Sequence, residues 1–359
     1  MHRSLLAVVL SALTIILPGL TLAGPFAYIT QPAADTVSVI DTATDTVTAT
    51  VSVGSAPRGV AVTPDGTRVY ITNLAGDTVS VIDTATNTVT ATVGVGDGPD
   101  GVAVSPDGAW AYVANRNDGT VTVVETATDT VATTVGVGTS PEGVAVSPDG
   151  SRVYVTDDDD DTVTVIDTAT NTVTTTVGVG SRPKGVAVTP DGTRAYVTNL
   201  VPNTVTVIDT ATDTVASTIG VGSNPIGAAI TPDGSRVYVT NLAGGTVSVI
   251  DTATDTVIAT VSVGDQPHGV AVTPDGAQVY VANYADGSVS VIDTATDTVT
   301  ASVGVGSGPR AFGTFIGPAD AGPSAPATIP TLSGWTMVIL AMLLAGLAVW
   351  RKRESGLRA

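Results

Sequence analysis

The chain has 359 residues, 43% hydrophobic but only 4% aromatic, so its core must be built mainly from Val, Ala and Ile. No cysteine is present, which excludes disulfides, thiolate metal sites and cysteine nucleophiles. The formal net charge is −19, and residues 25–318 hold nine Lys/Arg against 31 Asp/Glu, which excludes a basic groove and predicts no nucleic-acid partner.

Residues 1–24 have the features of a secretory signal peptide. Arg3 provides the positive start, residues 5–17 the apolar run, and Thr21-Leu-Ala23 the small-residue cleavage site. We expect signal peptidase to cut after Ala23, so that the rest of the chain is exported through the inner membrane. An uncleaved membrane anchor is the alternative.

Residues 25–318 consist of one unit repeated with a period of 42 residues. The period is marked by a tyrosine series and by an acidic residue that precedes Thr-Ala-Thr, and both keep this step without insertion or deletion. The two series are Tyr28, Tyr70, Tyr112, Tyr154, Tyr196, Tyr238 and Tyr280, and Asp41, Asp83, Glu125, Asp167, Asp209, Asp251 and Asp293. Seven copies at a fixed period indicate a repeat architecture.

Within one unit, hydrophobic residues alternate with a period of two, which predicts four strands. In the second unit these are residues 59–63, 68–73, 78–83 and 88–93. Pro64-Asp65-Gly66 predicts a hairpin turn, because proline presets one corner and glycine accepts the left-handed conformation. Residues 83–87 can turn because Asp and Asn side chains bind nearby backbone N–H groups.

A four-stranded antiparallel sheet repeated seven times predicts an all-β fold, a closed seven-bladed β-propeller over residues 25–318. The first unit lacks its opening strand, and the last is followed by an extra apolar segment, Arg310–Ile316. We therefore expect this C-terminal strand to complete the blade begun by residues 26–30 and to close the ring.

Several motifs of the unit resemble the YVTN family of β-propeller repeats. They are Tyr-Val-Thr-Asn at Tyr196 and Tyr238, Pro-Asp-Gly, and the Thr-Val-(Ser/Thr)-Val-Ile-Asp-Thr-Ala-Thr run, and the resemblance covers all seven units. Gln31 and Asp157 depart from it by replacing the asparagine. The resemblance implies a propeller in an exported or surface protein, without a single implied activity.

After the repeats, residues 319–328 form a linker rich in Pro and Ala, and residues 329–359 combine a short motif, an apolar stretch and a basic cluster. The apolar stretch, 336–350, predicts a transmembrane helix, and Arg351-Lys-Arg353 predicts a cytoplasmic end. The motif residues are Ile329, Pro330, Thr331, Leu332, Ser333 and Trp335. This order resembles the IPTL-type C-terminal sorting signal, which implies removal by an exosortase-like enzyme. A permanent anchor is the alternative.

Comparison of the seven copies with one another predicts where a ligand binds. The Pro-Asp-Gly and Thr-Ala-Thr turns hardly vary, whereas the loops at the opposite ends of the strands do, so we expect a binding site on that variable face. The residue that directly follows each inter-blade proline differs in nearly every copy. Pseudo-sevenfold symmetry predicts that these seven residues form a ring at the mouth of the central channel. The ring is Arg58, Asp100, Glu142, Lys184, Ile226, His268 and Arg310.

This ring has two alternative interpretations. With Asp100 and Glu142 adjacent and Arg310 beside Arg58, it can orient a polar or zwitterionic ligand. Alternatively, its members are solvated loop residues on an exposed rim.

A run of five carboxylates is the second candidate site: Asp157, Asp158, Asp159, Asp160 and Asp161. Calcium would relieve their mutual repulsion. Neither the glycine-centred loop nor the distant bidentate glutamate of a calcium loop accompanies them, and a solvated charge run is the alternative. No other cofactor is expected.

The residues available for catalysis are few. His268 is the only histidine left after signal removal, so it has no partner for a metal or haem site. We therefore expect a non-catalytic, exported cell-surface or envelope propeller that binds a surface protein or polysaccharide through its variable face. The alternative is a periplasmic propeller enzyme of the lactonase or quinoprotein-dehydrogenase kind.

Overall fold

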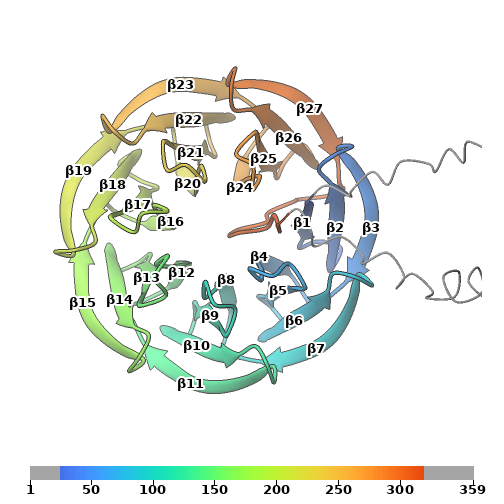
Figure 1. Ribbon diagram of the computed structural model, residues 1–359, viewed down its shortest axis with the longest axis vertical. Helices are drawn as coiled ribbons and strands as arrows, with labels where there is room; N and C mark the ends of the chain where they lie inside the picture. The colour runs from blue at the N-terminus through green and yellow to red at the C-terminus, as the bar shows by residue number, and fades with distance from the viewer. Residues whose placement is uncertain (1–24, 319–359) are drawn as a thin grey trace, which may run out of the picture.

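In the computed structural model, which describes residues 25–318, 27 strands form seven antiparallel sheets arranged as blades around a central channel (Figure 1). Blade 1 is three-stranded and blades 2–7 are four-stranded. The all-β, seven-bladed fold predicted from the sequence is confirmed.

In chain order the blades contain the following strands: blade 1, β1 (Phe26–Gln31), β2 (Thr36–Asp41) and β3 (Thr46–Ser52); blade 2, β4 (Pro57–Val62), β5 (Arg68–Asn73), β6 (Thr78–Asp83) and β7 (Thr88–Gly94); blade 3, β8 (Pro99–Val104), β9 (Trp110–Asn115), β10 (Thr120–Glu125) and β11 (Thr130–Gly136); blade 4, β12 (Pro141–Val146), β13 (Arg152–Asp157), β14 (Thr162–Asp167) and β15 (Thr172–Gly178); blade 5, β16 (Pro183–Val188), β17 (Arg194–Asn199), β18 (Thr204–Asp209) and β19 (Thr214–Gly220); blade 6, β20 (Pro225–Ile230), β21 (Arg236–Asn241), β22 (Thr246–Asp251) and β23 (Thr256–Ser262); and blade 7, β24 (Pro267–Val272), β25 (Gln278–Asn283), β26 (Ser288–Asp293) and β27 (Thr298–Gly304).

The turns form as their residue types require. Gly66 has a φ of 68°, and its N–H donates to the carbonyl oxygen of Thr63 at 2.8 Å, which closes the β4–β5 hairpin. At the β6–β7 turn, Asp83 accepts a hydrogen bond from the Thr86 N–H at 2.8 Å, and Asn87 adopts a φ of 52°, a conformation that Asn tolerates.

The core lies between blades, because each sheet covers the face of its neighbour. Tyr70 is fully buried and packs in one cluster with Val102 and Val113 of blade 3. Its hydroxyl donates to Asp129 of blade 3 at 2.8 Å. The tyrosine that marks the repeat therefore contributes apolar area and an inter-blade hydrogen bond.

The C-terminal segment closes the ring, but it is not a regular strand. Ala27 pairs with Ile316, and Tyr28 N–H donates to the Phe315 carbonyl at 2.9 Å, so the segment adds to the inner edge of blade 1. It also binds blade 2, where Val60 N–H donates to the Phe312 carbonyl at 2.8 Å. Because it bonds to two blades, it makes isolated bridges instead of one continuous ladder.

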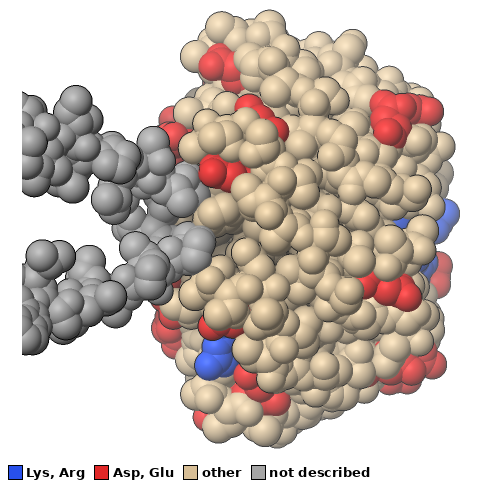
Figure 2. All heavy atoms as spheres, turned by 90° about the vertical axis from the view of Figure 1, so that its right-hand side faces the viewer, with Lys and Arg blue, Asp and Glu red and all other residues tan. Residues whose placement is uncertain are grey.

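Charge is distributed unevenly over the disc. In the side view of Figure 2, the rim is mostly uncharged and the carboxylates gather toward the two faces. No helix within residues 25–318 is long and apolar enough to cross a membrane. The predicted signal peptide, sorting motif and transmembrane helix lie outside the described residues.

Candidate functional site

The variable residues that follow the inter-blade prolines form the rim of the channel on one face. They lie at the second position of the innermost strands β4, β8, β12, β16, β20 and β24, and Arg310 takes the corresponding place in the closing segment. We call this surface the channel mouth: the ring Arg58, Asp100, Glu142, Lys184, Ile226, His268 and Arg310, together with Arg116, Asp158, Arg182 and Tyr284, which contact it.

A threonine and a glycine of the repeat hold the backbone of five of the seven ring residues in place, as blade 4 illustrates. In blade 4, Thr156 Oγ1 accepts from Gly143 N–H at 2.7 Å and donates to the carbonyl oxygen of Lys184 in blade 5, also at 2.7 Å. A Cβ on Gly143 would collide with that same carbonyl oxygen. The glycine that follows six of the seven variable residues therefore permits the inner strands to approach closely, so that the backbone of the ring is similar in these blades while its side chains differ.

The charged ring side chains form ion pairs. Arg58 Nη1 lies 2.7 Å from Asp100 Oδ2, and Lys184 Nζ binds Glu142 Oε2. Arg116 Nη1 lies 3.9 Å from Asp100 and 3.7 Å from Glu142, so these two carboxylates are neighbours around one guanidinium.

Three of the mouth residues come from a second position that the sequence analysis did not select. Arg116, Asp158 and Tyr284 each directly follow the second strand of their blade, where other blades have leucine or proline. Asp158 is fully buried and lies 3.2 Å from Arg116 and Arg182 and 3.0 Å from Lys184. The sequence signal that could have revealed them is this shared position within variable loops.

The ring is not the exposed, solvated rim that was the alternative expectation. Asp100 is 3% exposed and Lys184 5% exposed. Burial, with a contribution from Asp100, raises the pKa of Glu142. Although burial alone would raise the pKa of Asp158, its hydrogen bonds with Arg182 and Lys184 lower it. The carboxylates of the mouth are thus held in a partly dehydrated environment.

The aspartate run does not form a common cluster. Asp157 is buried beneath the loop, and Thr164 and Thr162 donate to it at 2.7 and 3.1 Å. Asp159 accepts from Ser140, Asp160 from the Thr139 N–H, and Asp161 from the Arg182 N–H. Within residues 25–318 no group of three or more His, Cys, Asp or Glu residues is placed to hold a metal ion. The geometry therefore does not support the predicted calcium site.

Arg310 and His268 form a separate part of the mouth. The Arg310 guanidinium carbon lies 5.0 Å from the centre of the Tyr284 ring, and Arg310 Nη1 lies 3.4 Å from His268 Nε2. Burial, then the positive charges of Arg310 and Arg58, lower the pKa of His268 well below its usual value. His268 is therefore neutral at physiological pH.

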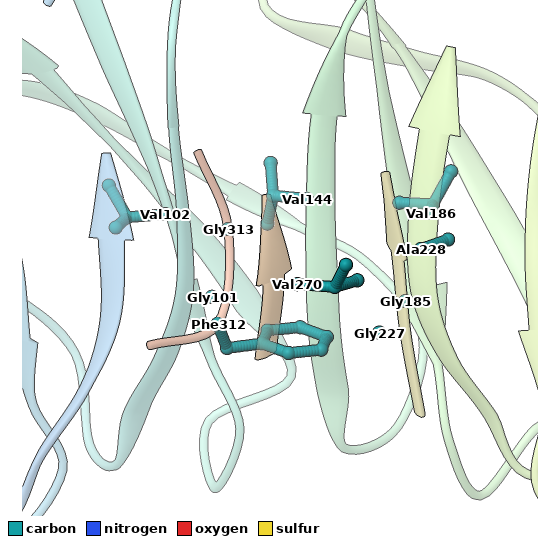
Figure 3. A pocket seen from close by; sticks show the side chains of 11 residues that line it. Gly101, Val102, Val144, Gly185, Val186, Gly227, Ala228, Val270, Phe312 and Gly313 are labelled. Atoms are coloured by element: carbon teal, nitrogen blue, oxygen red, sulfur yellow. The ribbon is translucent and has the colours of Figure 1, made fainter. Parts of the chain in front are cut away.

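Below the mouth, Phe312 projects into the channel and narrows it (Figure 3). The space around it is a cavity of about 30 Å³ lined by Val102, Val144, Val186 and Val270 of four inner strands. Nearer the opposite face, the channel widens into a chamber of about 410 Å³ lined largely by Val, Ala and Pro side chains. The mouth is therefore a shallow polar basin with an apolar floor.

The cations outside the mouth lie near the opposite, invariant face and connect neighbouring blades. They are Arg68, Arg152, Arg194 and Arg236, paired with Asp129, Asp213, Asp255 and Asp297. Each also donates to a backbone carbonyl of the next blade, as Arg194 does to Thr252 at 2.9 Å. The other five of the nine Lys and Arg residues of the propeller lie at the mouth.

Family comparisons agree with this architecture. Residues 145–235 and 224–309 match the YNCE-like beta-propeller model, and residues 84–177 match the lactonase, 7-bladed beta-propeller model. Residues 327–354 match the IPTL-CTERM motif. No curated protein shows significant sequence similarity to the chain.

The solved structures that are similar to the propeller include the following two. One is Kuenenia stuttgartiensis hydrazine synthase, 28% identical, with a TM-score of 0.70 over 77% of this chain and 97% of that chain. The other is a functionally unknown protein from Desulfotomaculum acetoxidans DSM 771, 18% identical, with a TM-score of 0.71 over 80% of this chain and 99% of that chain. The second shares the fold alone. The chain folds as a seven-bladed β-propeller whose residues 145–309 match the YNCE-like beta-propeller model, and it carries an IPTL-CTERM motif at residues 327–354.

Proposed function

We propose that this chain is an exported, non-catalytic propeller that binds a surface protein or polysaccharide at its channel mouth. The observation that carries this proposal is the placement of cations in an acidic domain. Five of nine Lys/Arg side chains gather with three carboxylates on the face whose loops vary, whereas the other four join blade to blade. The four inter-blade arginines all occupy one equivalent position of the repeat, whereas the five mouth cations come from three different positions and converge on one surface.

The IPTL-CTERM motif supports the location in this proposal, because it suggests export, processing by a sorting enzyme, and placement at the surface or envelope. We propose that residues 1–24 are a signal peptide, 25–318 the propeller, 319–328 a linker, and 329–359 the sorting motif, a membrane helix and a basic tail. The tail would be cytoplasmic before processing, and the propeller periplasmic or extracellular.

One observation favours a second function, an enzyme. The segment that matches the lactonase propeller model contains Asp100, Glu142 and Asp158, three carboxylates that meet at the mouth, and the pKa of Glu142 is raised. A buried carboxyl with a raised pKa can act as a general acid or base. Hydrolysis of a panel of lactones by the full chain, lost in Glu142→Gln, would support this alternative over the binding role.

The binding role is tested by retention of the purified full chain on native envelope material. Arg116→Gln removes a mouth cation. Arg194→Gln removes a comparably exposed arginine near the opposite face and is its matched control. We expect Arg116→Gln to weaken retention about tenfold or more, as loss of a partly buried charge contact does, and Arg194→Gln to leave it unchanged. Absence of retention by the wild type, or equal losses in both variants, would contradict the proposal.

A further inference from the structure

Arg310 differs from the other four mouth cations because it has no carboxylate partner among residues 25–318. It is half-buried, and burial, together with the nearby charge of Arg58, lowers its pKa. One face of its guanidinium is stacked on Tyr284. A half-buried cation without a carboxylate partner at ion-pair distance is costly, and a bound anion would reduce that cost.

His268 adds a second unsatisfied group. Its Nε2 lies 3.4 Å from the Arg310 Nη1 donor, so Nε2 is the acceptor and Nδ1 carries the proton of the neutral ring. Nδ1 is buried and has no hydrogen-bond partner within the described part of the chain. The edge-on packing of His268 on Phe312, with ring centroids 6.2 Å apart, holds the ring in this orientation. A buried N–H donor and a guanidinium without a carboxylate partner in residues 25–318 therefore lie in one corner of the mouth.

The charge of the whole mouth favours the same type of ligand. Five cations, Arg58, Arg116, Arg182, Lys184 and Arg310, face only three carboxylates, Asp100, Glu142 and Asp158. The mouth therefore carries excess positive charge inside a domain that is otherwise strongly acidic.

We propose that the corner formed by Arg310, His268 and Tyr284 binds the carboxylate group of a compact acidic ligand, such as a sugar acid or a small dicarboxylate. This inference rests on the proposed binding function and names the chemistry of its ligand. Nη1 of the guanidinium faces His268, and the planar fork of the guanidinium N–H groups matches a carboxylate.

The acidic loops around the mouth favour a compact ligand over a long polyanion. Three loop carboxylates accept hydrogen bonds from backbone N–H groups that lead into the next blade, which fixes these carboxylates around the basin. They are Asp35, Asp77 and Asp161. A long polyanion would pass over this acidic collar and be repelled, whereas a single carboxylate can enter the basin without crossing it.

Binding at this corner also reinforces closure of the ring. Arg310 N–H donates to the Thr30 carbonyl at 3.0 Å, and the Arg310 carbonyl accepts from Gly269 N–H at 2.9 Å, so this residue connects blade 1 with blade 7. A carboxylate held jointly by Arg310 and His268 would link the closing segment to blade 7. The ligand should therefore raise the thermal unfolding midpoint.

The test is calorimetric titration of the full chain with galacturonate, glutarate, polygalacturonate and, as the uncharged control, galactose, together with thermal unfolding. We expect one of the two compact carboxylates to bind and to raise the unfolding midpoint, galactose not to bind, and polygalacturonate to bind more weakly per carboxylate. If galacturonate binds more strongly than glutarate, the ligand is a sugar acid. If the two bind equally, the corner recognises the carboxylate alone. Absence of heat and of a midpoint shift with both compact acids overturns the proposal.

Variants separate this inference from the broader function. Arg310→Gln should weaken carboxylate binding at least tenfold, and Arg310→Lys, which keeps the charge, should weaken it less. His268→Phe, which keeps a ring against Phe312, should weaken binding while the unliganded unfolding midpoint stays near that of the wild type. If Arg310→Gln binds the acids as the wild type does, the inference fails. If envelope retention persists while neither acid binds, this inference fails and the proposed function stands.

Discussion

Asp157→Asn gives the sharpest test of how the repeat is stabilised. Asp157 is fully buried at the end of β13, in the position where five other blades have asparagine. Asn199, its counterpart in blade 5, donates to the hydroxyls of Thr204 and Thr206, whereas at Asp157 the threonines donate to the carboxylate. Burial nevertheless raises the pKa of Asp157 to about 6, well above the usual range of an aspartate.

The sign and size of the effect follow from linkage. Because the pKa of the folded state is raised, the group favours folding fully below about pH 4, and this contribution is lost as the pH rises through about 6. The difference between this raised pKa and the pKa of an aspartate in the unfolded chain, about 4, corresponds to about 3 kcal/mol. Asp157→Asn, which cannot ionise, should therefore be about 3 kcal/mol more stable than the wild type at pH 7 and nearly equal to it at pH 4.

The assay is urea unfolding of the full chain between pH 4 and pH 8. Asn199→Asp is the matched control, because it places the same carboxyl in blade 5 and should impose the pH dependence that Asp157→Asn removes. A stability difference between Asp157→Asn and the wild type that does not change with pH would refute the reasoning.

Three further predictions concern the inter-blade contacts and the ends of the chain. Tyr70→Phe should lower the free energy of unfolding by about 1–2 kcal/mol, because it removes the hydrogen bond to Asp129. Tyr28→Phe should change it little, since the Tyr28 hydroxyl has no partner among residues 25–318. Equal effects of the two substitutions in denaturant titrations would contradict this prediction. Gly143→Ala should lower the free energy of unfolding by about 2 kcal/mol or more, because the added Cβ collides with the neighbouring inner strand. Gly136→Ala, with open space around its Cβ, should leave stability unchanged or slightly raise it. An unchanged melting temperature for Gly143→Ala would contradict the claim that the inner strands approach closely at this glycine. Fractionation of native cells with intact-mass analysis should find the propeller outside the cytoplasm without the segment from Trp335 onward; a full-length chain in the inner membrane would instead indicate a permanent anchor.

The fold was predictable because each blade repeats its own signals. The tyrosine and acidic series fixed the period, Pro-Asp-Gly fixed one hairpin, and the missing first strand pointed to closure by the C-terminal segment. The conformation of that segment was not predictable, because Phe312 and Phe315 bond to two different blades and neither blade alone decides their geometry.

The candidate site was predictable only in part. Symmetry alone places the variable residues around one channel, so the ring could be inferred without side-chain positions. Which side chains pair depends on distances across blades, and Arg116 and Asp158 reach the ring from a different loop. The arrangement of the aspartate run also depends on contacts that the sequence does not show. Its members are adjacent in sequence, but local turn geometry directs Asp157 inward and Asp158 toward the mouth.

The central claim, that the variable face binds the ligand, is tested most directly by hydrogen exchange. The full chain would be labelled with and without retained envelope material or a bound carboxylate, and protection mapped along the sequence. We predict protection at the mouth, in the segments that begin at the inter-blade prolines and in the loops after β9, β13 and β25. Protection confined to the Pro-Asp-Gly turns of the opposite face would contradict the claim.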